Sequence, residues 1–460
     1  MLFNTLTYLI FLPIVFAIYW TMRGARAKNV VIILASCVFY GWWDVRFLAL
    51  MIATCIVNFF TTRALVGSSS ARGRKAWLTA TLLANFAVLA AFKYWGFFAE
   101  SLATLLGAVG FNADIPTLNV LLPVGISFYT FQLSGYAVDV YRRPEIGRGV
   151  SLLTFLAFIT FFPQLVAGPI ERWSNMRGQM QANRTFDYTT AREGMRLLLW
   201  GLVKKMLIAD NCASVADYIF AGHATLSTPD LWIGALAFTF QIYGDFSGYS
   251  DMAIGSARLF GIQLSRNFST PYFAANLRDF WRRWHATLMS WFKDYVYIPL
   301  GGNRRGRLRQ QLNTVVVFLL SGLWHGAGLT FIVWGLYHAL WRLVPTSPRT
   351  LPFWRWATFP VVLIGWVIFR SDTLPAAGIY IGRMFNPALW GPTTCSRMPL
   401  ALIALLVGIE WCMHGHEHPF AFADRGLQRH QPVRMAVYLA VVALVFFFGG
   451  EKAQFIYFQF

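Results

Sequence analysis

The chain has 460 residues, of which 57% are hydrophobic and 13% are charged. A soluble protein of average composition has about 25% charged and about 45–50% apolar residues. Apolar runs recur from one end of the chain to the other, so the composition predicts one polytopic membrane protein rather than soluble domains. The net charge of +19 would favour nucleic-acid binding in a soluble protein. Here the basic residues cluster between apolar runs, as in cytoplasmic loops, and we expect no nucleic-acid partner.

Apolar runs predict the positions of the membrane helices. They lie at about 5–20, 29–43, 46–61, 77–98, 118–140, 151–168, 195–213, 230–243, 312–340, 356–370, 399–413 and 434–449. Several are shorter than the roughly 20 residues of a full crossing, so re-entrant pieces are expected, above all between 160 and 300. We expect an all-α bundle of about 11–12 membrane helices, including short or re-entrant ones.

We expect a single membrane domain over residues 1–460. Its predicted parts are N-terminal helices in 1–150, a core with the candidate site in 151–345, and C-terminal helices in 346–460. No basic residue precedes the first apolar run, which therefore predicts a retained helix rather than a cleaved signal peptide.

Basic residues alternate between loops in the first 150 residues. They follow the first, third and fifth runs, at 23–28, 63–75 and 142–148, whereas the loop 99–117 has no Lys or Arg. By the positive-inside rule, this pattern predicts cytoplasmic basic loops and an N-terminus on the opposite, periplasmic side.

One ionisable residue, His325, lies in the middle of the apolar run Val315–Trp334. An ionisable side chain at membrane depth is costly and therefore indicates a functional site. Burial keeps an imidazole neutral, and a neutral ring can accept the proton of a hydroxyl that attacks a carbonyl carbon. The alternative is a histidine that only holds helices together by hydrogen bonds. Small residues surround it: Ser321, Gly322, Gly326 and Gly328.

The segment 265–310 combines aromatic and charged residues. Apolar side chains at helical spacing predict one amphipathic helix, and they are Phe280, Trp284, Leu288 and Trp291. This helix either lies at the membrane interface, held by Trp and Arg side chains, or forms a wall of the active site. In the second case His285 supports His325 by orienting donor or acceptor. In the first case it is an interfacial histidine beside Trp284.

The stretch Tyr243–Asp251 places two carboxylates, Asp245 and Asp251, beside an apolar run. We expect them to face a polar cavity or to pair with arginines. Ser247 lacks the spacing and the preceding strand of a nucleophile elbow, so we do not expect a serine nucleophile.

Two further segments have an open interpretation. The segment Gly301–Arg309 is rich in Gly and Arg, and it is either a cytoplasmic anchor loop or a site that attracts the phosphates of a coenzyme. The segment His414–His418 is rich in titratable residues that could bind a metal ion adventitiously, and we interpret it instead as a solvated loop. The five cysteines form no Cys-x-x-Cys pair, and we expect no metal site.

Several motifs together resemble the membrane-bound O-acyltransferase family. They are Pro123–Tyr129, Tyr243–Met252, Phe280–His285, Tyr297–Arg304 and Gly322–Gly326, with Ala167–Pro169 and Phe455–Phe460. The resemblance extends over nearly the whole chain and is most specific in 243–326. Within the family, the chain is most similar to the bacterial branch that serves envelope polysaccharides, among them alginate and teichoic acids.

The resemblance implies a funnelled helical bundle with a thin centre, where a cytoplasmic donor meets an extracytoplasmic acceptor. It places the catalytic histidine at His325 and the second motif histidine at His285. It implies no bound cofactor, acetyl-CoA as the donor substrate, and contact with membrane lipid. The implied partners are a periplasmic acetyltransferase of the SGNH hydrolase type and a polysaccharide synthase. Further candidates for substrate contacts are Trp324, Trp284, Arg282, Arg283, Asn303, Arg304, Arg305 and Asp251.

These inferences predict an O-acyltransferase of the bacterial inner membrane. It would pass an acetyl group from a cytoplasmic thioester across the membrane for O-acetylation of an exopolysaccharide such as alginate or cellulose. Direct attack of a hydroxyl on the thioester is expected, since no covalent nucleophile is evident. One alternative is a D-alanyl or lipid acyltransferase. An alternative of another class is a transporter or flippase for acyl groups or polymer.

Overall fold

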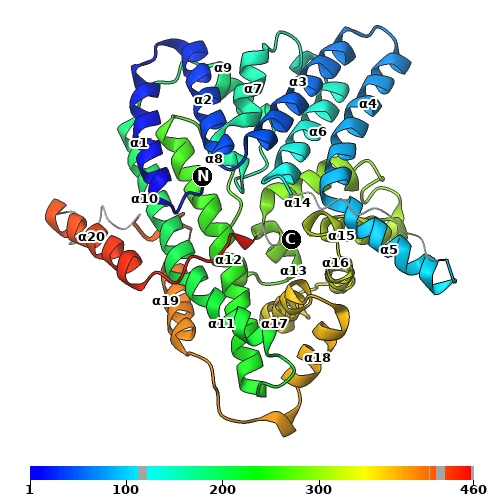
Figure 1. Ribbon diagram of the computed structural model, residues 1–460, viewed down its shortest axis with the longest axis vertical. Coiled ribbons are helices and arrows are strands. Elements are labelled where there is room, and N and C mark those ends of the chain that lie inside the picture. Colours follow the sequence, from blue (N-terminus) through cyan, green and yellow to red (C-terminus); the bar gives the residue numbers. More distant parts are fainter. Residues whose placement is uncertain (112–121, 414, 421–429, 457–460) are drawn as a thin grey trace. The chain divides into compact units, whose positions relative to one another are not determined.

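The computed structural model describes residues 1–460 except 112–121, 414, 421–429 and 457–460 (Figure 1). The described residues form helices and loops without any strand, which confirms the all-α fold class. They fall into two compact units. Unit 1 comprises Met1–Phe186, Phe260–Gln263 and Gly326–Gly328, and unit 2 comprises Asp187–Leu259, Leu264–His325 and Leu329–Phe460. The predicted single domain stays a prediction.

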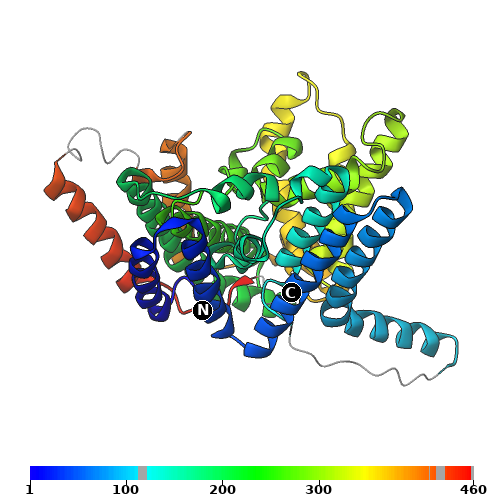
Figure 2. The same ribbon diagram turned by 90° about the horizontal axis from the view of Figure 1, so that it is seen from above.

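Unit 1 is built from nine α-helices among its described residues. They are α1 (Leu6–Thr21), α2 (Gly24–Gly41), α3 (Val45–Gly67), α4 (Ala71–Leu89), α5 (Trp95–Ala108), α6 (Ile126–Arg142), α7 (Leu152–Thr160), α8 (Phe162–Leu165) and α9 (Trp173–Gln181). The helices α3, α4 and α6 lie side by side in both views (Figure 2). Asn58 on α3 and Asn85 on α4 exchange amide hydrogen bonds of 2.6 and 3.0 Å, and Asn85 also bonds Ser134 on α6. In a membrane, apolar side chains pack as well against lipid as against another helix. Hydrogen bonds between buried amides therefore help to hold helices together.

Unit 2 is organised around α12 (Thr228–Leu259), a helix of 32 residues that is buried along most of its length. The other α-helices described here are α10 (Tyr188–Leu202), α11 (Asp210–Ala221), α13 (Leu277–Arg283), α14 (Ala286–Phe292), α15 (Gly306–His325), α16 (Leu329–Leu343), α17 (Leu351–Arg370), α18 (Leu374–Met384), α19 (Met398–Cys412) and α20 (Gln431–Phe448). Two π-helical segments, Val203–Ala209 and Lys293–Tyr297, follow α10 and α14.

The helices α10 and α12 pack with their backbones in contact. Gly201 faces Gly248, and a Cβ atom added to Gly248 would lie 2.7 Å from the carbonyl oxygen of Gly201. One heptad earlier on α10, Gly194 faces Gly255 in the same reciprocal way. Small residues on both helices are what permits this approach. Neither contact has room for a side chain.

Among the described residues, four helical stretches are long and apolar enough to cross a membrane: Val45–Gly67, Ala71–Ala108, Leu351–Arg370 and Gln431–Phe448. Two shorter apolar helices are Leu6–Thr21 and Met398–Cys412. These six coincide with expected spans.

Several expected spans differ from the structure. The expected span 151–168, for example, divides into α7 and α8. The expected span 312–340 is two helices, α15 and α16, because the chain leaves the helix at Gly326–Gly328. The expected span 230–243 continues to Leu259 within α12. The total number of crossings stays a prediction.

The glycine contact between α10 and α12 is open to a direct test. Gly248→Leu would force a side chain against the α10 backbone, and we expect roughly 3 kcal/mol or more of destabilisation. The measurement is the yield and thermal unfolding of detergent-purified protein. Gly378→Leu on α18, where an added Cβ meets nothing within 4 Å, is the control. Equal unfolding temperatures for the two variants would contradict the packing argument.

Candidate active site

His325 is the last residue of α15, and 6% of its surface is exposed. Gly326 and Gly328 follow it, and glycine is the residue that most readily ends a helix. The carbonyl groups at a helix C-terminus favour a nearby positive charge. An imidazole at this point is therefore well placed to hold a proton for part of a reaction.

An aromatic shell surrounds the His325 ring. The ring centroids of Trp324, Trp334 and Phe369 lie 4.9, 5.3 and 5.4 Å from it. Trp334 comes from α16 and Phe369 from α17, so three helices of unit 2 meet at this histidine. Gly322 on α15 and Gly335 on α16 each leave room for the backbone of the other helix. This close approach brings Trp334 onto the His325 ring.

His285 lies at a break between two helices. The expected continuous helix is α13 and α14, and His285 between them has a φ of 43°, in the left-handed region. A non-glycine residue in this region costs of order 1–3 kcal/mol unless its surroundings hold it there. The amphipathic spacing therefore correctly predicts helical structure within α13 and within α14. The prediction that they form one continuous helix is wrong.

Asn267 holds the turn at His285. Its carbonyl oxygen accepts from the N–H of Ala286 at 3.0 Å. Its side-chain oxygen accepts from the hydroxyl and the N–H of Thr287 at 2.7 and 3.3 Å. These bonds satisfy donors in the first turn of α14 that a helix leaves unpaired. Asn267 is fully buried, and the sequence reasoning did not identify it.

The two candidate histidines share a neighbour. The His285 ring is 1% exposed, and its centroid lies 5.8 Å from that of Trp324 and 4.7 Å from that of Phe246 on α12. Trp324 in turn contacts His325. The structure thus gathers His285, Trp324 and His325, although forty residues separate the two histidines in the sequence. Their catalytic roles stay predictions.

Trp284 points into the core rather than to a surface. It is 2% exposed, and its ring contacts Phe268 at 5.1 Å and Trp366 at 4.8 Å. Because Trp366 also stacks on Trp334 at 5.9 Å, Trp284 belongs to the packing behind His325.

Two lysines pair with the carboxylates of α12. Lys204 lies 2.6 Å from Asp251, and Lys205 lies 2.9 Å from Asp245 and 2.8 Å from Asp210. The carboxylates are paired with cations, but the expected arginine partners are wrong, because the cations are lysines. Asp251 is therefore engaged with Lys204, and its predicted contact with substrate stays a prediction.

The end of the described chain joins the same cluster. Asp245 accepts from the N–H of Ile456 at 2.7 Å, and Lys205 donates to the carbonyl of Ala453 at 3.2 Å. The Phe455 ring lies 4.2 Å from that of Tyr249 on α12. The buried charges thus fasten the segment 450–456 against the helix that carries Phe246.

The remaining motif residues are exposed or paired elsewhere. Arg282 and Arg283 form salt bridges of 2.6 and 2.9 Å with Asp279. Asn303, Arg304 and Arg305 are exposed in the turn before α15.

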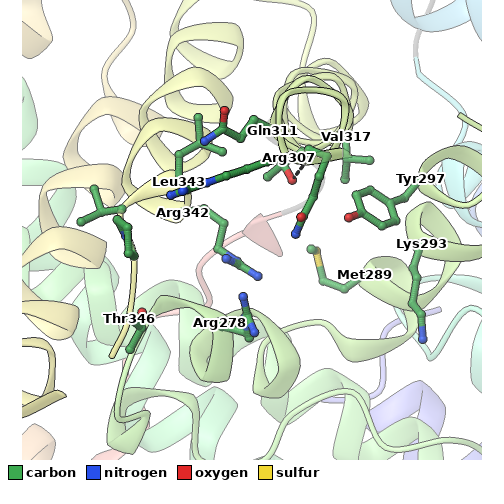
Figure 3. Close-up of a pocket in the computed structure, with 14 residues that line it drawn as sticks. Arg278, Met289, Lys293, Tyr297, Arg307, Gln311, Val317, Arg342, Leu343 and Thr346 are labelled. Carbon is green, nitrogen blue, oxygen red and sulfur yellow. Dashed lines mark hydrogen bonds between the residues drawn. The ribbon is translucent and has the colours of Figure 1, made fainter. Parts of the chain in front are cut away.

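A basic cavity of about 390 Å³ lies near these residues in sequence, but none of the five lines it. Its wall contains four cationic side chains and no carboxylate among the described residues (Figure 3). The lining residues are Arg278, Met289, Lys293, Tyr297, Arg307, Gln310, Gln311, Thr314, Val317, Arg342, Leu343, Val344, Pro345 and Thr346.

Two arginines of this basic cavity point toward one another, Arg278 from α13 and Arg342 from the end of α16. Burial and the positive charge of Arg278 both lower the pKa of the Arg342 guanidinium. Like charges held together without a counter-charge favour binding of an anion. The sequence reasoning did not identify this cavity because its cations come from four separate segments.

The segment around His418 corrects an expectation. His418 is 3% exposed and pairs with Glu193 at 3.0 Å, so it is not part of a solvated loop. His414 lies outside the described residues. In the part of the chain that the structure describes, no group of three or more His, Cys, Asp or Glu side chains could hold a metal ion.

Comparisons with known proteins decide the family. The model of the membrane-bound O-acyltransferase family matches residues 118–347. A probable alginate O-acetylase AlgI from Pseudomonas syringae pv. tomato is 41% identical over 410 residues, which is 87% of this chain and 78% of that protein. The chain belongs to the membrane-bound O-acyltransferase family. It is an O-acyltransferase and a membrane protein.

Other relatives widen the range of acceptors within the family. A peptidoglycan O-acetyltransferase from Helicobacter pylori is 32% identical and covers 100% of this chain and 98% of that protein. A teichoic acid D-alanyltransferase from Bacillus subtilis is 28% identical over 54% of this chain and 67% of that protein. Cell-envelope polymers appear in the names of all three relatives.

Removal of the Asn267 side chain should impair this O-acyltransferase without removing a reacting group. Asn267→Ala leaves the first turn of α14 without its acceptor, and loss of such a cap costs roughly 1 kcal/mol. We expect acyl transfer to fall several-fold while the protein remains folded. Asn267→Asp, which keeps the acceptor, is the comparison in the same assay. If the alanine and aspartate variants lose equal activity, the acceptor role is wrong.

Proposed function

We propose that the protein transfers an acetyl group from a cytoplasmic thioester to a hydroxyl, for O-acetylation of an envelope exopolysaccharide such as alginate. His325 accepts the proton of the hydroxyl as its oxygen attacks the thioester carbonyl carbon. The C–O bond forms, the C–S bond breaks, and the thiolate leaves with the proton that His325 took up. Atoms and charge balance with no covalent enzyme intermediate.

The observation that carries this proposal is the course of α15. Its first half lines the basic cavity, from Arg307 to Val317, and its last residue is His325. A helix of 20 residues is about 30 Å long, roughly the thickness of the hydrocarbon core. The phosphates of an anionic donor would bind at one end of α15, and the general base His325 lies at the other. This separation suits a donor with a long flexible arm between its phosphates and its thioester.

Aromatic side chains connect the two ends of α15. Phe318 follows the cavity residue Val317 and lies 5.3 Å from Trp281. Trp281 lies 5.7 Å from Trp334, which contacts His325 at 5.3 Å. We propose that the arm of a coenzyme A thioester lies against this row of rings, while its phosphates stay at the arginines. We therefore propose acetyl-CoA as the donor.

The relatives support acetyl rather than D-alanyl transfer. The alginate O-acetylase relative matches 87% of this chain at 41% identity, whereas the teichoic acid relative matches 54% at 28%. On this proposal the enzyme lies in the bacterial inner membrane with a periplasmic N-terminus, because its basic loops mark the cytoplasmic side. An SGNH-type acetyltransferase in the periplasm and the polysaccharide synthase are the proposed partners.

His325→Ala should abolish acetyl transfer and leave the protein folded. General-base catalysis contributes roughly 10²–10⁴-fold to a rate, so release of free CoA from acetyl-CoA should fall to the limit of detection. His430→Ala, at an exposed histidine, is the matched control. Normal CoA release by the His325 variant would overturn the assignment. Acetyl movement without thioester cleavage in the unmodified protein would favour a transporter.

If the basic cavity binds the phosphates of acetyl-CoA, loss of its arginines should weaken binding of donors that carry phosphate and of no others. Arg278→Gln with Arg342→Gln removes two phosphate contacts, and we expect the KM for acetyl-CoA to rise roughly tenfold or more. The KM for S-acetyl-pantetheine, which has no phosphate, should not change. Arg355→Gln, at an exposed arginine outside the cavity and outside the candidate residues, is the control. Equal defects with both donors would mean that the arginines serve only the local fold.

A further inference from the structure

A second cavity of about 420 Å³ lies in unit 1, against α3 and α6. Its lining residues are Phe59, Thr62, Arg63, Val66, Gly67, Tyr136, Gly147, Arg148, Gly149 and Val150. The loop that follows α6 forms one wall, and it lies directly on α3. A Cβ atom added to Gly147 would be 3.0 Å from Val66 and 2.9 Å from Val140, so only glycine permits this approach.

The position of the cavity along α3 places it at a membrane surface. The helix is one of those long and apolar enough to cross the bilayer, and it ends at Gly67. Arg63 lies four residues before that end, and Phe59 lies one turn deeper, about 6 Å along the axis. The neighbouring side chains Val57 and Phe60 are 45% and 56% exposed, as expected for a face that contacts lipid. The cavity therefore spans the boundary between headgroups and hydrocarbon.

The cavity is positively charged, and none of its described lining residues carries a negative charge. Arg63 and Arg148 are both exposed, and neither forms a hydrogen bond or ion pair with any other described residue. No Asp or Glu is among the lining residues. Arg74 on α4 differs, because its guanidinium donates to the carbonyl of Tyr141. Two unpaired arginines at this depth attract an anionic group.

We propose that this cavity binds the phosphate headgroup of an anionic phospholipid. Arg63 and Arg148 would contact the phosphate, and the apolar residues Phe59, Val66 and Val150 would contact the glycerol and the start of an acyl chain. The apolar wall and the open lipid-facing side of α3 favour a lipid over a free phosphate ion. The positive-inside pattern assigns this end of α3 to the cytoplasmic leaflet. The proposal is independent of the acyl transfer at His325.

Lipid binding can be measured on the full-length protein, purified in detergent and delipidated, by native mass spectrometry during titration. The probes are phosphatidylglycerol, phosphatidylcholine with the same chains, and glycerol 3-phosphate as a competitor. We expect tight binding of phosphatidylglycerol, roughly tenfold weaker binding of the zwitterionic lipid, and no competition by glycerol 3-phosphate at equal concentration.

Variants locate the bound lipid. Arg63→Gln with Arg148→Gln should lower the affinity for phosphatidylglycerol to that for phosphatidylcholine. Arg63→Lys with Arg148→Lys, which keeps both charges, should retain most of it. Arg26→Gln with Arg72→Gln changes two other exposed arginines of unit 1 and should have no effect.

Three results would overturn the proposal. They are equal binding of the two lipids, equal loss in the control pair, and effective competition by glycerol 3-phosphate, which would indicate a soluble phosphate ligand. None of these results bears on His325, because acetyl transfer is not measured.

Discussion

The pairing of Lys204 and Lys205 with carboxylates on α12 is the interaction on which the architecture of unit 2 depends. A carboxylate in a protein core that faces lipid is costly unless a cation and hydrogen bonds accompany it. The lysines are adjacent in the chain, and the π-helical segment that carries them lets one reach Asp251 and the other Asp245. Removal of either lysine would leave a buried charge without its partner. The same cluster holds α11 through Asp210 and the segment 450–456 through Ile456.

A series of contacts connects the buried ion pairs on α12 with the candidate active site. The helix α12 presents Phe246 to His285, and Asn267 fixes the turn in which His285 lies. Trp324 then links His285 to His325, at the junction of α15 with α16 and α17. The geometry places His325, the proposed general base, at the end of α15, whose first half contributes to the wall of the basic cavity.

The sequence predicts the fold class and most apolar spans, because these follow from hydropathy. Local motifs also single out His285 and His325, which the structure brings to one neighbour, Trp324, while their catalytic roles stay predictions. It predicts wrongly where local periodicity continues through a break. The spacing of Phe280, Trp284 and Leu288 is helical, yet the chain turns at His285 because Asn267 provides hydrogen bonds from a distant segment. The basic cavity was missed for a similar reason, since Arg278 and Arg342 meet only after folding. The motif arginines Arg282 and Arg283 are close to His285 in the sequence, but in the structure both form salt bridges with Asp279.

The contact between α10 and α12 has a consequence for the motions of the enzyme. Two helices whose backbones touch at paired glycines cannot slide or rotate without collision, since no flexible side chain lies between them to rearrange. The buried ion pairs add a second restraint in the same place. This pair therefore behaves as a rigid frame throughout turnover. Any opening that admits a donor or releases a thiol must come from short elements joined by turns, such as α13 and α14, so α12 and α10 can serve as the fixed reference against which such elements move.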